Sequence, residues 1–125
     1  MDRELPQADD PERAILGTIL VHPPALFEAQ AVLKSEHFFR EAHRCVYDAM
    51  CSLHLAKAPI SLITLKAELE RSGKLDRAGG IPYLVQLSSD GFAGAAVMHY
   101  AEMVREAYTL RRIVEIGTTA SEKAC

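Results

Sequence analysis

Residues 36–54 read EHFFREAHRCVYDAMCSLH, and this stretch decides what kind of domain the chain forms. Apolar side chains recur here, and just beyond, at every third or fourth position, which places them on one face of an α-helix. They are Ala42, Cys45, Val46, Ala49, Met50, Leu53 and Ala56. Because Pro59 follows and proline does not continue a helix, the pattern predicts a helix over residues 41–57. We expect its apolar face, with Phe38 and Phe39, to be the packing centre of the domain.

Helix start and stop signals occur on both sides of this stretch. Before it, DDPERAILGTILVHPP offers Asp10 as an N-cap, a proline at the first helical position and a proline pair as terminator. Gly17 in the middle of this helix costs about 1 kcal/mol relative to alanine, so we expect another helix to approach closely there. After it, PISLITLKAELERSGKL offers Ser61 as an N-cap and Gly73 as the left-handed residue at the helix end.

We call the part of the chain before the last predicted helix the head. Its remaining segments are also helical in pattern. Leucine and alanine at helical spacing predict a helix in residues 24–33, and GGIPYLVQLSS predicts another that begins near Pro82. No segment of useful length alternates polar and apolar residues as a strand does. With 125 residues, 49% of them hydrophobic and none tryptophan, the chain suits one domain built from aliphatic side chains. The predicted fold class is all-α.

Residues 95–124 form the longest predicted helix, about 45 Å if it is continuous. One stripe contains Val97, Tyr100, Ala101, Val104 and Tyr108 and is suited to seal the head, but it continues into Arg111, Arg112 and Glu115. The apolar face has then moved round the helix to Met103, Ala107, Leu110 and Val114, with Ile113 and Ile116 further round. We therefore expect the second half to leave the head and pack on a second helix or another subunit. The alternative is a break at residues 117–119 and a fold-back.

Charge and cysteine content limit the possible function classes. A net charge of −3 and a pI near 5.9 give no electrostatic footprint for nonspecific binding to DNA or an anionic membrane. Three cysteines without framework spacing are typical of reduced thiols in the cytosol. The polar N-terminus does not resemble a signal peptide, and no apolar run reaches the roughly 18 residues of a membrane span. These features predict a cytoplasmic protein with no membrane partner.

The histidines and cysteines of the opening stretch do not form a metal site. His43 and His54 are eleven residues apart, a rise of about 16 Å, whereas metal ligands lie roughly 2 Å from the ion. Cys45 and Cys51 point about 120° apart on the helix. Cys51 and His54 could supply two ligands, but no other two follow at a recognisable spacing. We expect no catalytic, cofactor-binding or metal-binding residue in the chain.

A second stripe on the same helix consists of Tyr47, Cys51 and Leu55, which the helical spacing places outward. Cys45 points instead to the core, where a thiol behaves as a small apolar group. The outer stripe is either a contact surface for a partner or a set of scattered surface apolar residues.

Five segments, in order and at similar spacing, give the chain its family resemblance: PERAILGTIL, EHFFREAHRCVYDAM, PISLITLKAELERSGKL, GGIPYLVQLSS and HYAEMVREAYTLRRI. Together they cover almost the whole chain, and it resembles the N-terminal domain of the bacterial replicative DNA helicase family, DnaB. The resemblance implies a compact helical head followed by a long helical hairpin. On this basis we expect a head over residues 1–93 and, over 94–125, a long helix that resembles the first arm of the hairpin.

The resemblance also implies partners. Six such domains form a collar as a trimer of dimers, and the collar docks primase and possibly a helicase loader. ATP and magnesium belong to a separate RecA-like ATPase domain that is absent from this chain, and DNA is contacted only through the full-length hexamer. The expected function is thus oligomerisation and primase docking for an ATP-dependent helicase, with no enzymatic activity in these 125 residues.

Two sets of residues are expected to contact partners. The first is on the last helix and comprises Tyr108, Leu110, Ile113, Val114 and Ile116, unless a return helix covers them all. The second is the outer stripe of Tyr47, Cys51 and Leu55. Two other functions stay open: a stand-alone all-α adaptor or regulator with no helicase domain, and a small thiol or metal enzyme built on the opening stretch.

Overall fold

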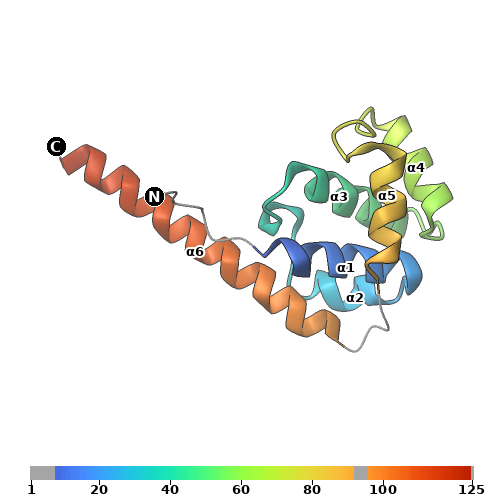
Figure 1. The fold of residues 1–125 in the computed structure, drawn as a ribbon, viewed down its shortest axis with the longest axis horizontal. Helices are drawn as coiled ribbons and strands as arrows, with labels where there is room; N and C mark the ends of the chain where they lie inside the picture. The colour runs from blue at the N-terminus through green and yellow to red at the C-terminus, as the bar shows by residue number, and fades with distance from the viewer. Residues whose placement is uncertain (1–7, 92–95, 125) are drawn as a thin grey trace.

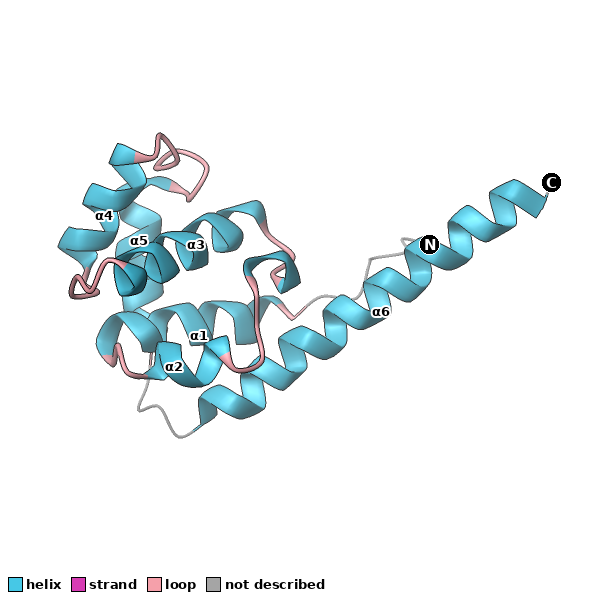
Figure 2. Cartoon of the chain, turned by 180° about the vertical axis from the view of Figure 1, so that it is seen from behind, coloured by secondary structure: helices cyan, strands magenta, loops and turns pink. Residues whose placement is uncertain are grey.

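A computed structural model describes residues 8–91 and 96–124, and within these ranges the chain is helical and has no strand (Figures 1 and 2). The elements follow the order α1 (Asp9–Val21), α2 (Ala25–Gln30), the 3-10 turn η1 (Ser35–His37), α3 (Glu41–Leu55), α4 (Leu62–Arg71), α5 (Gly80–Ser89) and α6 (Val97–Ala124). The predicted all-α fold class is confirmed. No helix in the described ranges is long and apolar enough to cross a membrane.

Helix α1 is the centre of the head and packs against α2, α3, α5 and α6. Helix α4 lies on the other side of α3 and α5, and α6 runs along α1, α2 and η1. The C-terminal half of α6 extends away from the head as a single rod (Figure 1). A compact head and a projecting helix are therefore the two parts of the described structure.

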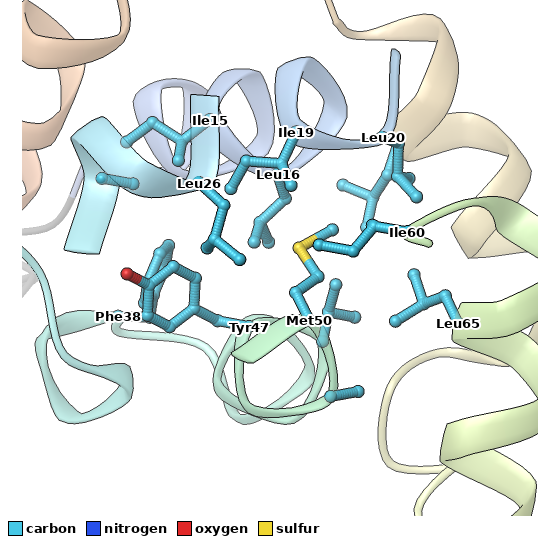
Figure 3. Close-up of a cluster of buried hydrophobic side chains, with 14 of the residues drawn as sticks. Ile15, Leu16, Ile19, Leu20, Leu26, Phe38, Tyr47, Met50, Ile60 and Leu65 are labelled. Carbon is cyan, nitrogen blue, oxygen red and sulfur yellow. The ribbon is translucent and has the colours of Figure 1, made fainter. Parts of the chain in front are cut away.

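The core lies between α1 and α3 (Figure 3). Ile15, Leu16 and Ile19 of α1 face Phe38, Tyr47 and Met50 from the other side, and Leu65 closes the core from α4. The apolar face predicted for α3 is buried at Cys45, Val46, Ala49, Met50 and Leu53 and half-buried at Ala42. Ala56 is exposed, because α3 ends at Leu55 and not at the predicted residue 57. The opening stretch of the sequence is thus the packing centre of the head, as predicted.

Gly17 provides the close helix approach that the sequence predicts. A Cβ atom at this position would lie 2.1 Å from the carbonyl oxygen of Leu87 and 2.7 Å from the backbone nitrogen of Gly91. The reverse is also true, since a Cβ on Gly91 would lie 2.4 Å from the carbonyl oxygen of Gly17. Two glycines are therefore needed where α1 meets the end of α5.

The structure confirms the predicted ends of α4 but not the predicted N-cap of α1. The Ser61 hydroxyl caps α4 by accepting a hydrogen bond from the Thr64 backbone nitrogen at 3.2 Å, and Gly73 follows α4 with a φ of 71°, as predicted. The prediction of Asp10 as an N-cap is wrong, because α1 already begins at Asp9 and its N-cap is Ala8, which has no side-chain hydrogen bond.

Helix α6 is continuous for 28 residues, or about 42 Å. It passes through Gly117 without interruption, so the alternative of a break at residues 117–119 is wrong. The predicted boundary between residues 93 and 94 lies outside the described residues, and the ranges 1–93 and 94–125 stay predictions.

Candidate interaction surface

The first half of α6 is fixed to the head by apolar contacts. Val97, Ala101 and Val104 are buried, which matches the expectation that their stripe seals the head. Ala107, which was expected on the face that moves away from the head, is buried with them. These four positions step by three or four residues and so lie on one side of the helix. The docked side of α6 is thereby set, and the other sides of the helix face away from its own head.

Arg111 continues this docked side, as its place in the stripe predicts, but the sequence analysis did not anticipate its burial. Its guanidinium is buried and donates a hydrogen bond of 3.0 Å to the carbonyl oxygen of His37. It lies 5.0 Å from the centre of the Phe39 ring and 5.8 Å from that of Tyr108. Burial lowers the pKa of Arg111, and the negative charge of Glu12 acts in the opposite direction. A charged residue therefore ends the contact between helix and head.

Tyr108 belongs more to the head contact than to an outer surface. It is half-buried, and its ring meets His37 edge-on with the centres 4.7 Å apart. Burial, followed by the charge of Arg105, lowers the pKa of His37. Tyr108, one of the five residues predicted on this helix, is thus part of the contact between α6 and the head.

The other four are exposed. Leu110, Ile113, Val114 and Ile116 keep 44, 59, 43 and 59% of their surface accessible. We call these four residues the α6 apolar surface. Large apolar side chains that cluster in seven consecutive positions of a projecting helix are typical of a contact site for another chain.

The second predicted surface does not form, because Tyr47 is buried. Only 1% of its surface is accessible, its hydroxyl donates to the carbonyl oxygen of Leu33 at 3.0 Å, and its ring packs on Phe38. The segment that follows α2 covers this side of α3, which spacing along α3 alone could not reveal. The outward placement of Tyr47 was therefore wrong.

Cys51 and Leu55, the other two residues of this predicted stripe, differ in how far they are exposed. Cys51 is half-buried and its Sγ accepts a hydrogen bond from Gln30 Nε2 at 3.4 Å, while Leu55 is 85% exposed. Burial raises the pKa of the Cys51 thiol, which disfavours the thiolate that a nucleophile needs. Within the described residues, no three histidine, cysteine or acidic side chains are grouped so that they could hold a metal ion.

A buried polar network joins three helices, and the sequence analysis missed it. His43 Nδ1 lies 2.6 Å from Glu12 Oε1, and His43 Nε2 lies 2.6 Å from the Tyr83 hydroxyl. The other carboxylate oxygen of Glu12 accepts from the backbone nitrogen of Phe39 at 2.8 Å. Glu12 occupies the same helical face as Ile15 and the rest of the α1 core, and this was the available signal. The network ties α1, α3 and α5 together.

The geometry defines a class first: an all-α head that presents a projecting helix with an exposed apolar surface is a protein-interaction domain. The family follows from comparison. Residues 4–106 match the family model described as the DnaB-like helicase N terminal domain. The chain belongs to this family.

Individual relatives agree with the family match. The replicative DNA helicase DnaC of Bacillus subtilis is 36% identical over 121 residues, which cover 97% of this chain and 27% of the relative. The crystal structure of the N-terminal domain of DnaB helicase from Mycobacterium tuberculosis has a TM-score of 0.92 at 37% identity and covers 97% of this chain and 84% of that one.

A third comparison concerns a larger protein. The structure of a DnaB-like replicative helicase, described with its interactions with primase, has a TM-score of 0.78 at 25% identity and covers 93% of this chain and 27% of that one. The chain thus spans about a quarter of the length of the curated relatives that it matches.

Proposed function

We propose that this chain acts as the N-terminal oligomerisation and primase-docking domain of a replicative DNA helicase. The observation that carries the proposal is the α6 apolar surface, which begins beside the last head contact at Arg111 and stays exposed among the described residues. In this proposal the full-length protein unwinds DNA with ATP and magnesium bound in a separate ATPase domain. DNA contact belongs to the full-length hexamer, which agrees with the net charge of −3 on this chain.

Self-association is the first part of the proposal. Burying a fully exposed leucine, isoleucine or valine side chain is worth about 1.5–3 kcal/mol, and each of the four residues retains roughly half of its surface for such burial. A shared contact of this kind stabilises a dimer, and three dimers complete a collar of six.

Primase docking is the second part. Its support is the family membership and the likeness to a helicase structure described with its interactions with primase. A helicase loader is a further partner that the same collar could accept.

Light scattering on the chain over a range of concentrations tests the first part. We expect a mass above that of the monomer, and a return to the monomer for Leu110→Asp and Val114→Asp. Phe27→Asp is the matched control, since Phe27 is also an exposed apolar side chain but lies on α2. A chain that is monomeric at every concentration would contradict the self-association.

Size-exclusion chromatography with the primase of the same cell tests the second part. We expect the chain and the primase to elute together when the chain is self-associated. Separate elution of the two proteins, with the chain in its associated form, would contradict primase docking and leave self-association in place.

A further inference from the structure

A shallow apolar groove lies between α4 and α5. Its volume is about 140 Å³, close to the roughly 150 Å³ of an apolar cavity that accepts a benzene ring. Three of its apolar side chains, Ile63, Ile81 and Val85, keep 80, 44 and 49% of their surface accessible. The groove therefore has room for one large apolar side chain from outside. Its full lining is Leu62, Ile63, Lys66, Ile81, Leu84 and Val85.

Lys66 brings the only charge to this lining, which contains no carboxylate. The side chain is exposed and has no ion-pair partner among the residues that the structure describes. The chain as a whole carries a net charge of −3, so this apolar groove with a cation beside it differs in sign from the rest of the protein. An occupant with a carboxylate is attracted to Lys66, and an occupant with a cation is repelled.

The spacing of the lining indicates the shape of the occupant. A groove between two helices is a common seat for an amphipathic helix, whose contacts recur every three or four residues. Ile63 and Lys66 are three positions apart on α4, so the apolar space and the cation lie about one helical turn apart. An apolar residue and an acidic residue three or four positions apart on another helix match this arrangement.

A second copy of this chain is a poor occupant. The proposed self-association uses the α6 apolar surface, and α6 packs on α1, α2 and η1, whereas α4 packs on α3 and α5. If two copies met groove to groove, the symmetry axis would pass through this small surface and bring the two Lys66 side chains together. Contact between like charges is unfavourable. The charge of the groove therefore favours a different protein.

We propose that the α4–α5 groove binds an amphipathic helix of another protein. The helix places one large apolar side chain between Ile63 and Val85, and a carboxylate one turn away pairs with Lys66. This goes beyond the proposed function, because it gives the head a docking site that is separate from the α6 apolar surface. Self-association does not cover the groove, so both contacts are compatible in one assembly.

A synthetic alanine-based helical peptide is the probe. It carries a leucine and, four positions away, a glutamate, and its binding to the chain is followed by NMR of the isoleucine methyl groups. We expect the signals of Ile63 and Ile81 to shift, while those of Ile113 and Ile116 on α6 stay in place. A matched peptide with lysine for the glutamate should bind about fivefold more weakly. The Lys66→Glu chain should reverse this preference.

Ile63→Asp should abolish binding of the glutamate peptide. Phe27→Asp is the matched control, since Phe27 is 76% exposed and lines a different apolar groove. Circular dichroism checks that both variants keep the helical content of the wild type. Lys66→Glu, which changes an exposed side chain, tests the same site if Ile63→Asp does not fold.

Three results would overturn the groove site: equal binding of the two peptides, methyl shifts on α6 in place of the groove, and equal losses in Ile63→Asp and Phe27→Asp. Sedimentation equilibrium of Ile63→Asp supplies a fourth. A lower mass than the wild type would show that a second copy occupies the groove, which contradicts the proposal. None of these results depends on the α6 apolar surface, so the proposed function is tested separately.

Discussion

The Arg111 guanidinium donates a hydrogen bond to the carbonyl oxygen of His37, although 74 positions separate the two residues in sequence. This bond lies where α6 leaves the head, and the Phe39 ring covers the same guanidinium. The angle at which α6 projects is therefore fixed by a buried cation and by the apolar stripe before it. The exposed part of α6 is thus presented in a defined direction.

Replacing Arg111 with alanine should destabilise the chain by about 1–3 kcal/mol, because the His37 carbonyl then loses its partner in a buried place. Arg112→Ala is the control, since Arg112 is exposed and should change the free energy of unfolding by less than about 0.5 kcal/mol. Urea unfolding followed by circular dichroism measures both. Equal effects of the two variants would show that Arg111 does not anchor α6.

Gly17→Ala should destabilise the head by about 1–3 kcal/mol or more, because the added Cβ meets backbone atoms of Leu87 and Gly91 that cannot rotate away. Gly117→Ala is the opposite case, since nothing lies within 4 Å of its Cβ position, and it should stabilise α6 by up to about 1 kcal/mol. Thermal unfolding of both variants measures the contrast. A tolerated alanine at Gly17 would contradict the close approach of α1 and α5.

Tyr83→Phe should destabilise the head by about 1–3 kcal/mol, because it leaves His43 Nε2 without its hydroxyl partner inside the network. Ser88→Ala removes another hydroxyl from α5, but its hydrogen bond to the Val85 carbonyl is exposed to solvent, so the effect should be below about 0.5 kcal/mol. Urea unfolding compares the two. Similar small losses would mean that the network adds little to stability.

The His37 imidazole should make the chain less stable in mild acid. Its pKa is lowered in the folded state, first by burial and then by Arg105, and its Nδ1 accepts a hydrogen bond from the Lys34 backbone nitrogen at 2.8 Å. The unfolded state therefore binds the proton first, and the stabilisation is complete above the ordinary value of 6.5 and is lost as the pH falls below it.

The contribution of His37 is isolated by measuring the free energy of unfolding at pH 7.5 and at pH 5.5. His37→Asn retains a side-chain acceptor and removes the titration, so the drop in the free energy of unfolding between the two pH values should be smaller than in the wild type. Apart from residue 37, the two proteins have the same amino-acid sequence. An identical drop in the two proteins would assign the acid sensitivity to another group.

Local patterns predicted much of this structure. The α3 core face, the close approach at Gly17, the cap at Ser61 and the continuous projecting helix all follow from spacing along one segment. Each of these features depends on residues within a few helical turns of it in the sequence. Sequence spacing can predict features of this local kind.

The features that the sequence did not reveal all depend on distant segments. Tyr47 is buried because the segment after α2 covers it. Arg111 is buried because its guanidinium donates to the His37 carbonyl oxygen and lies over the Phe39 ring. Glu12 is buried because His43 and the Phe39 backbone satisfy its carboxylate. Helical periodicity places Glu12 and Arg111 on the buried faces of their helices, but the charge of each side chain favours solvent. Only the tertiary partners show that these two charged side chains are buried.

Sedimentation equilibrium of the wild-type chain beside Leu110→Asp tests the central claim most directly. The α6 apolar surface predicts that the wild-type mass rises above the monomer with concentration and that the Leu110→Asp mass stays at the monomer, while both proteins give the same helical circular dichroism spectrum. Equal masses for the two proteins at every concentration would contradict the claim that this surface joins one copy to another.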